Sequence, residues 1–194
     1  AKVVAALGSI TGVVHSALVL KDASLARMDE ESFRAALSAK VDASVNLATV
    51  FGRDAPEGLT VFSSMMSFAK TAGQSNYAAG CTFADAFAHA FRLSAGVPAK
   101  VMNWGFWGSV GIVATEAYRE RMDRFGFGSV EPDEGMAALE VLLAGPVNQV
   151  AFLKTTRPMT KEIDGVADEA LYVLPGEAPS VIGGLKPYGR RFHG

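Results

Sequence analysis

The sequence predicts an α/β fold in which helices flank a parallel sheet. Short apolar runs rich in β-branched and aromatic residues alternate with longer segments of helical period. This alternation is typical of the strand–helix units that build a parallel sheet. The chain has 194 residues, of which 49% are hydrophobic and 20% are charged, and this is enough to bury one sizeable core. We therefore expect a single α/β domain.

Four short apolar runs are the expected strands. Each is short and rich in β-branched or aromatic residues, as strands that are buried on both faces tend to be. They comprise residues 12–15, 59–63, 100–103 and 149–153.

Four segments of helical period are the expected helices. The first extends from Asp29, whose side chain suits an N-cap, to Phe51, and Lys40 falls on its apolar stripe. The other three cover residues 75–94, 115–125 and 132–143, the last with a proline at its start. Residues 104–111 hold three glycines and two tryptophans, which predicts a shaped loop.

The domain is expected to occupy residues 1–158. Periodicity fades after Thr155, and residues 159–194 mix proline, glycine and charge, which predicts a tail or an interdomain linker. The chain begins with Ala1 rather than methionine, so we expect it to be a piece of a longer protein.

Composition excludes several classes of function. The 18 basic and 20 acidic residues are scattered and give a formal charge of −2, so neither nucleic-acid binding nor binding to an anionic membrane is expected. No apolar run approaches the roughly 20 residues that span a bilayer. Cys81 is the only cysteine and the three histidines are dispersed, which argues against a disulfide framework and a metal site and favours the reducing cytoplasm.

Two hydroxyl side chains form the candidate catalytic pair. Ser64 follows the second strand directly, so it lies at the carboxyl edge of the sheet, where open α/β folds bind ligands. Tyr77 comes thirteen positions later, in the first turns of the next helix. We expect both hydroxyls to converge on one carbonyl oxygen, Ser64 by hydrogen bonding and Tyr77 by donating a proton.

Lys40 is the expected support of this pair. A tyrosine with a pKa of about 10 is a slow partner in proton transfer near neutral pH. A lysine on the inward face of a helix needs a partner, and a nearby ammonium favours the phenolate. We therefore expect Lys40 to lie near Tyr77 and to lower its pKa.

Each of these residues also has a purely structural interpretation. Alone, Ser64 is more often a strand-end hydroxyl bonded to the backbone, and Tyr77 is more often a core residue. Lys40 alone is a lysine whose stem covers apolar surface. Cys81 is interpreted as a small buried hydrophobic residue because no histidine is placed beside it. The joint spacing favours the catalytic interpretation.

The run QSNYAAGCTF at residues 74–83, together with Ser64, resembles the active-site sequence of short-chain dehydrogenases. Those enzymes usually place a lysine four residues after the tyrosine, where this sequence has Cys81. Ketoreductase domains of bacterial modular polyketide synthases exchange the positions of lysine and asparagine, and Lys40 in the run AKVD matches the exchanged lysine. The resemblance covers about residues 10 to 155.

Two further runs extend this resemblance. Residues 12–17 (GVVHSA) resemble the fourth strand of the family, and residues 103–108 (NWGFWG) resemble its nicotinamide-side loop. The run at residues 74–86 is similar to ketoreductases of assembly lines that use a free-standing acyltransferase. The resemblance implies cofactor contacts from His15, Ser16, Lys40, Tyr77, Trp104 and Gly105.

The resemblance implies NADPH-dependent reduction of a β-ketoacyl thioester to a 3-hydroxyacyl thioester in polyketide biosynthesis. The substrate is carried on the phosphopantetheine arm of an acyl carrier protein, which would be a partner together with the other domains of the synthase. The substrate side of the site would include Asp22, Phe106 and Trp107. Cys81 joins the catalytic set because it fills the position of the family's asparagine, although a thiol is the weaker hydrogen-bonding group.

The stereochemical class is also implied by resemblance. Residues 20–22 (LKD) align with the Leu-Asp-Asp signature and keep its final aspartate, and no tryptophan stands eight residues before Tyr77. This favours a D-configured 3-hydroxyl product. The helix at residues 115–125, which carries Met122 and Phe125, would be the lid over the substrate arm.

One departure from the family concerns the nucleotide. No Gly-x-Gly-x-x-Gly follows any expected strand. The expected fold is thus a Rossmann-like sheet truncated at its N-terminal nucleotide-binding half, which we expect upstream in the parent protein. The alternatives left open are a domain that no longer reduces and instead epimerises an α-substituent, and a domain that only supports its module.

Overall fold

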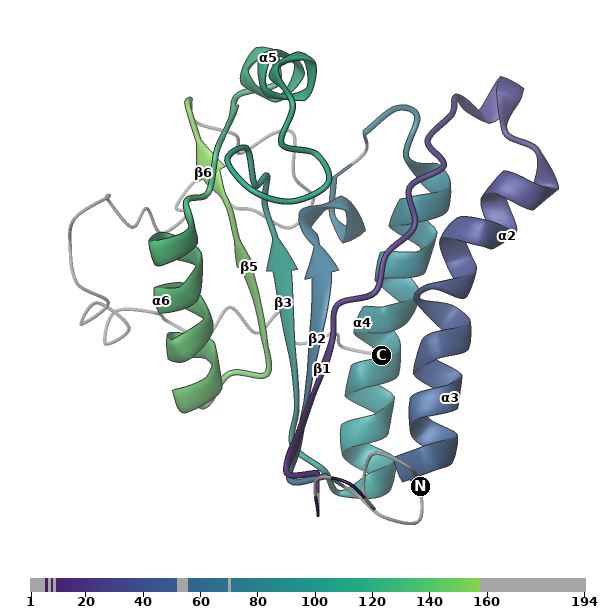
Figure 1. The fold of residues 1–194 in the computed structure, drawn as a ribbon, viewed down its shortest axis with the longest axis vertical. Helices are drawn as coiled ribbons and strands as arrows, with labels where there is room; N and C mark the ends of the chain where they lie inside the picture. The colour runs from purple at the N-terminus through teal and green to yellow at the C-terminus, as the bar shows by residue number, and fades with distance from the viewer. Residues whose placement is uncertain (1–5, 7, 9, 52–55, 70, 158–194) are drawn as a thin grey trace, which may run out of the picture.

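A four-stranded parallel sheet in the order β1-β2-β3-β5 forms the centre of the fold (Figure 1). The computed structural model describes residues 6, 8, 10–51, 56–69 and 71–157, so the tail or linker expected at residues 159–194 lies outside them. The strands are β1 (Gly12–His15), β2 (Gly58–Ser64), β3 (Ala99–Trp104) and β5 (Gln149–Phe152). All four expected strands are confirmed. β2 and β3 each extend one residue further at each end than expected, and β5 ends one residue earlier.

Helices cover both faces of this sheet (Figure 1). The α-helices in the described part of the chain are α2 (Glu30–Ser38), α3 (Val41–Phe51), α4 (Ser75–Ala95), α5 (Glu116–Arg124) and α6 (Pro132–Ala144). Two short 3₁₀ helices, η1 (Leu25–Arg27) and η2 (Met65–Ser67), follow β1 and β2. An antiparallel pair of β4 (Phe127–Gly128) and β6 (Lys154–Thr155), which the sequence did not predict, closes the end of the described chain.

Alternation along the strands assigns the helices to the two faces. Val61 and Val101 pack with residues of α3 and α4 in one core cluster. Met102, the next residue of β3, packs instead with Leu142 of α6 in a second cluster. The α2–α4 layer and α6 therefore lie on opposite faces, while α5 lies beyond the carboxyl ends of the strands (Figure 1).

The helix expected from Asp29 to Phe51 is wrong as a single element. Asp29 does cap α2 by accepting a hydrogen bond of 2.7 Å from the Ser32 amide. The α-helical hydrogen-bond pattern breaks at Ala39 and Lys40, where the Lys40 amide bonds Leu37 O three residues back instead of four. This tighter turn is where the Lys40 side chain enters the interior, so the break separates α2 from α3 at the buried lysine.

The remaining helices agree with the expected segments. Thr115, expected inside a helix, caps α5 by accepting a hydrogen bond from the Tyr118 amide. Pro132 opens α6 as expected. No helix in the described part of the chain has the length and apolar character needed to cross a membrane.

The core under α6 gives a matched test of this packing. Leu142 is fully buried, whereas its neighbour Leu143 is 49% exposed. In the complete domain, Leu142→Ala is expected to lower the free energy of unfolding by about 2 to 5 kcal/mol, because a cavity replaces the side chain. Leu143→Ala is expected to change it by less than about 0.5 kcal/mol. Urea denaturation measures both, and equal losses would contradict the assignment of α6 to this face.

Candidate active site

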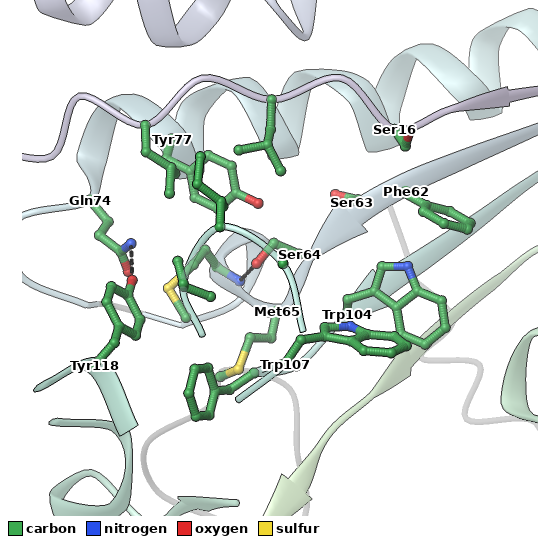
Figure 2. Close-up of a pocket in the computed structure, with 18 of the residues that line it drawn as sticks. Ser16, Phe62, Ser63, Ser64, Met65, Gln74, Tyr77, Trp104, Trp107 and Tyr118 are labelled. Atoms are coloured by element: carbon green, nitrogen blue, oxygen red, sulfur yellow. Dashed lines mark hydrogen bonds between the residues drawn. The ribbon is translucent and has the colours of Figure 1, made fainter. Parts of the chain in front are cut away.

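A cavity of about 360 Å³ opens at the carboxyl ends of β2 and β3 (Figure 2). Its walls come from the end of β2, the start of α4, the loop after β3 and α5, so it lies where open parallel sheets bind ligands. Its volume is within the range of small-molecule sites. Ser16, Lys40, Ser64, Tyr77, Trp104, Gly105, Phe106 and Trp107 from the expected site residues line it.

The backbone turn after β2 orients the Ser64 hydroxyl. Ser64 caps η2, and its Oγ accepts a hydrogen bond of 3.2 Å from the Met66 amide (Figure 2). A hydroxyl has one hydrogen and two acceptor lone pairs. Because the amide occupies the acceptor side, the Ser64 hydrogen remains available to donate into the cavity.

Tyr77 lies in the first turn of α4 and faces Ser64 across the cavity (Figure 2). Burial raises the pKa of Tyr77, Cys81 raises it further, and hydrogen bonding with Ser64 partly offsets both. This direction is opposite to the expected lowering by Lys40, because burial disfavours the phenolate. The phenol is accordingly held in its protonated form.

Asn76 anchors the start of the same helix. Its side-chain Nδ2 donates a 2.8 Å hydrogen bond to the Lys21 carbonyl oxygen, and its Oδ1 accepts from the Tyr77 amide. Asn76 is fully buried. These bonds hold the first turn of α4 against the segment after β1. They therefore also hold the backbone position from which the Tyr77 side chain extends.

Lys40 is a buried ammonium at the base of the cavity. It is 2% exposed, and its Nζ donates a 2.6 Å hydrogen bond to the Phe62 carbonyl oxygen of β2. Burial lowers the pKa of Lys40, and the nearby charge of Asp85 opposes that shift. An ammonium has three donors, so the bond to Phe62 leaves Lys40 with donor capacity beside the cavity.

Cys81 and His15 stand behind the cavity wall. Cys81 is fully buried, and burial raises the pKa of its thiol, so the neutral form is favoured. Burial and the Lys40 charge both lower the pKa of His15, whose Nε2 has no hydrogen-bond partner among the described residues. Neither residue lines the cavity, so any role in it is exerted through neighbours such as Lys40 and Tyr77.

Aromatic rings form the wall opposite α4. Trp104 makes edge contacts with Phe62, Trp107 and Phe152 at ring-centroid distances of 5.4, 5.0 and 6.3 Å. Gly105 has a structural reason to be glycine, since a Cβ there would lie 2.9 Å from Leu153 Cα. The expected loop thus begins at the end of β3, and its rings present a rigid apolar surface to the cavity (Figure 2).

Asp22 reaches the cavity only through Gln74. Gln74 Nε2 donates hydrogen bonds of 2.8 Å to Asp22 Oδ2 and 3.1 Å to Tyr118 Oη. Gln74 and Tyr118 line the cavity, whereas Asp22 does not (Figure 2). Sequence reasoning missed both lining residues. The available signal for Gln74 was a polar residue three positions before Tyr77.

Methionines line the side of the cavity nearest α5. Met122 of α5 is 4% exposed and packs with Met65, Met66 and Phe106. Phe125, the other residue expected on the lid helix, is 49% exposed and lies just beyond the end of α5. Thioether side chains adapt to irregular apolar shapes. Only Met122 of the expected lid pair therefore contributes to this wall.

No group of three or more potential metal ligands occurs among the described residues. The polar side-chain groups at the cavity are instead hydroxyls, two indole N–H groups, one amide and one ammonium. This set can donate hydrogen bonds and a proton to an oxygen atom.

Comparison with known proteins identifies relatives along most of the chain. A family model described as the KR domain matches residues 1–109. Polyketide synthase PksM of Bacillus subtilis (strain 168) is 46% identical over 171 residues, which are 88% of this chain and 4% of that protein. Polyketide synthase ThaG of Burkholderia thailandensis is 51% identical over 150 residues, covering 77% of this chain and 3% of that protein.

Solved structures agree with these relatives. An A-type ketoreductase from a modular polyketide synthase superposes with a TM-score of 0.70 at 30% identity, covering 75% of this chain and 30% of the solved one. A ketoreductase domain from the bacillaene assembly line gives a TM-score of 0.71 at 25% identity, covering 78% and 38%. The chain thus spans only a small part of the synthases and about a third of the solved chains. By sequence and by fold it belongs to the ketoreductase (KR) domain family of polyketide synthases.

Proposed function

We propose that the domain containing this chain reduces a β-ketoacyl thioester on an acyl carrier protein to a 3-hydroxyacyl thioester, with NADPH as the reductant. One observation carries the proposal above the others. The hydroxyls of Ser64 and Tyr77 face one another at the cavity, and Ser64 Oγ accepts the Met66 amide hydrogen, so its own hydrogen is free to be donated. Two donors on one small cavity suit a carbonyl oxygen that gains negative charge.

The two hydroxyls have different tasks in this proposal. Ser64 donates a hydrogen bond to the β-carbonyl oxygen and holds it. Tyr77 transfers its proton to that oxygen as the carbon is reduced. A raised pKa suits this role, because Tyr77 stays protonated until the oxygen becomes an alkoxide, which is a stronger base than a phenolate.

We propose that the cavity holds the nicotinamide–ribose part of NADPH. When bound, NADPH supplies the hydride for the β-carbon. Lys40 has donors beyond its bond to Phe62, which suits ribose hydroxyls. Ser16 and Trp104 line the same region, and His15 Nε2 is a buried nitrogen without a partner in the described chain. We assign no pyrophosphate site to this chain, since its described part has no Gly-x-Gly-x-x-Gly turn between a strand and a helix.

The proposed substrate and partners follow from the rest of the cavity. Methionine and aromatic side chains suit the apolar part of an acyl chain. The thioester would arrive on the phosphopantetheine arm of an acyl carrier protein, with other domains of the synthase as permanent partners. We propose the cytoplasm as the compartment, which the single buried thiol of Cys81 suits.

Removal of one oxygen atom tests the role of Tyr77. In the complete domain, Tyr77→Phe is expected to lower kcat for reduction of a simple β-keto thioester by at least about 100-fold, because the proton donor is lost. Tyr118→Phe, which removes the other phenol hydroxyl of the cavity, is the matched comparison and is expected to cost less than about 10-fold. NADPH oxidation measured at 340 nm reports both.

Equal turnover by the wild-type domain and Tyr77→Phe would contradict the catalytic assignment. A wild-type domain without measurable turnover would instead favour the alternatives, an epimerase or a domain that supports its module. Exchange of an α-hydrogen in deuterated water separates those two.

The pH profile tests the proposed cation of Lys40. Burial lowers its pKa from the ordinary value of 10.5, so the cation is lost at a lower pH than that of a solvated lysine as the pH rises. We expect kcat to fall with a midpoint below 10.5. Deprotonation of Tyr77 does not explain a fall of kcat at this pH, because burial raises the pKa of Tyr77 above its ordinary value. A midpoint at or above 10.5, with Lys40→Met still active, would overturn the assignment.

The configuration of the product tests the proposed stereochemical class. Asp22 is retained, and Ala69 rather than tryptophan stands eight residues before Tyr77. By the family resemblance we propose a D-configured 3-hydroxyl. Chiral chromatography of the reduced thioester distinguishes the enantiomers, and an excess of the L-configured product would refute this class while leaving the reductase function intact.

A further inference from the structure

Three polar side chains beneath the cavity form a continuous hydrogen-bonded group. Asn103 lies on β3 directly beside Ser63 of β2, and it is fully buried. Its Nδ2 donates to the carbonyl oxygen of Ser64 at 3.1 Å and to Asp85 Oδ2 of α4 at 2.9 Å. Gln149 of β5 completes the group. We call Asp85, Asn103 and Gln149 the β3 polar cluster.

The carboxylate of Asp85 determines which end of the Asn103 amide faces Ser64. An ionised carboxylate can only accept hydrogen bonds, so Asn103 must present its nitrogen to it. The nitrogen carries two hydrogens, and the second one meets the Ser64 carbonyl. If the amide were reversed, two pairs of oxygen atoms would face each other, one with Asp85 and one with Ser64.

Gln149 secures the same orientation from the other side. Its Nε2 donates to Asn103 Oδ1 at 2.8 Å and to Asp85 Oδ2 at 3.2 Å. Asn103 therefore has a donor on its oxygen and acceptors on its nitrogen, and every polar atom of its amide is satisfied. Because Asn103 itself is fully buried, these partners favour one orientation of its amide, since the reversed amide would leave buried groups unsatisfied.

The cluster acts on the turn that orients the Ser64 hydroxyl. Ser64 is the last residue of β2, its carbonyl is held by Asn103, and its Oγ accepts the Met66 amide hydrogen. The backbone that carries this hydroxyl is thus fixed from the side of β3 at the point where the strand ends. A shift of about 1 Å in a reacting group can cost on the order of 100-fold in rate.

We propose that Asp85, Asn103 and Gln149 are positioning residues that hold the backbone of Ser64, and so aim its hydroxyl at the substrate carbonyl. None of the three lines the large cavity, so they act through Ser64 rather than on substrate. This inference rests on the proposed reductase function and extends it to residues outside the cavity.

An exchange of the two polar partners separates positioning from mere stability. Asn103→Asp places two carboxylates together and removes the donor to Ser64. The double variant Asp85→Asn with Asn103→Asp restores an amide–carboxylate bond between α4 and β3, yet it leaves a carboxylate oxygen facing the Ser64 carbonyl. Asp133→Asn makes the same chemical change at an exposed carboxylate of α6 and is the matched control.

The complete domain is used for three measurements on each variant: Tm, kcat with KM, and hydrogen exchange of the Met66 amide. Asn103→Asp is expected to lower both Tm and kcat. The double variant is expected to regain most of the lost Tm, while its kcat stays about 10-fold or more below wild type with KM changed less than about 3-fold. Its Met66 amide is expected to exchange faster than in wild type.

Recovery of kcat together with Tm in the double variant would overturn the positioning role, since stability alone would then explain the cluster. Unchanged Met66 exchange in the double variant would do the same. If the wild-type domain does not reduce the thioester at all, the proposed function fails, and Met66 exchange still decides whether the cluster holds the Ser64 turn. Asp133→Asn is expected to match wild type in kcat and in Met66 exchange.

Discussion

The hydrogen bond from the Met66 amide to Ser64 Oγ is the interaction on which the rest of the site depends. It uses the acceptor side of the hydroxyl and leaves the hydrogen for the cavity. It can form because β2 ends at Ser64 and the chain turns at once into η2.

The fold supports this short turn from two layers. On the side of the α2–α4 layer, the tight turn between α2 and α3 brings Lys40 to the Phe62 carbonyl, two residues before Ser64. On the side of β3, Asn103 holds the carbonyl of Ser64 itself. The end of β2 is therefore fixed by side chains that are far away in sequence. The apolar walls of the cavity surround this fixed end, which carries the Ser64 hydroxyl.

The sequence predicted the elements of the fold well because periodicity reports local structure. The four strands and the positions of α4, α5 and α6 follow from the alternation of apolar runs. The break between α2 and α3 could not be read in this way, since the apolar stripe continues through it. The break coincides with the buried Lys40, whose carbonyl partner lies on a strand 22 residues away.

The site residues that belong to a sequence motif could be predicted, whereas the residues whose role depends on contacts between distant elements could not. Ser64, Tyr77 and Lys40 line one cavity as expected. The pKa of Tyr77 moves opposite to the expected direction, because the degree of burial is a property of the whole fold. Gln74 and Asn103 acquire their contacts from Tyr118 and Asp85, which lie on other elements, so spacing along the chain could not identify them.

The most direct test of the central claim is a crystal structure of the complete domain with NADP⁺ and a non-reducible β-keto thioester analogue. We predict that the β-carbonyl oxygen lies about 2.6 to 3.2 Å from both Ser64 Oγ and Tyr77 Oη. A carbonyl oxygen beyond hydrogen-bonding distance of both hydroxyls, in a fully occupied site, would contradict the account.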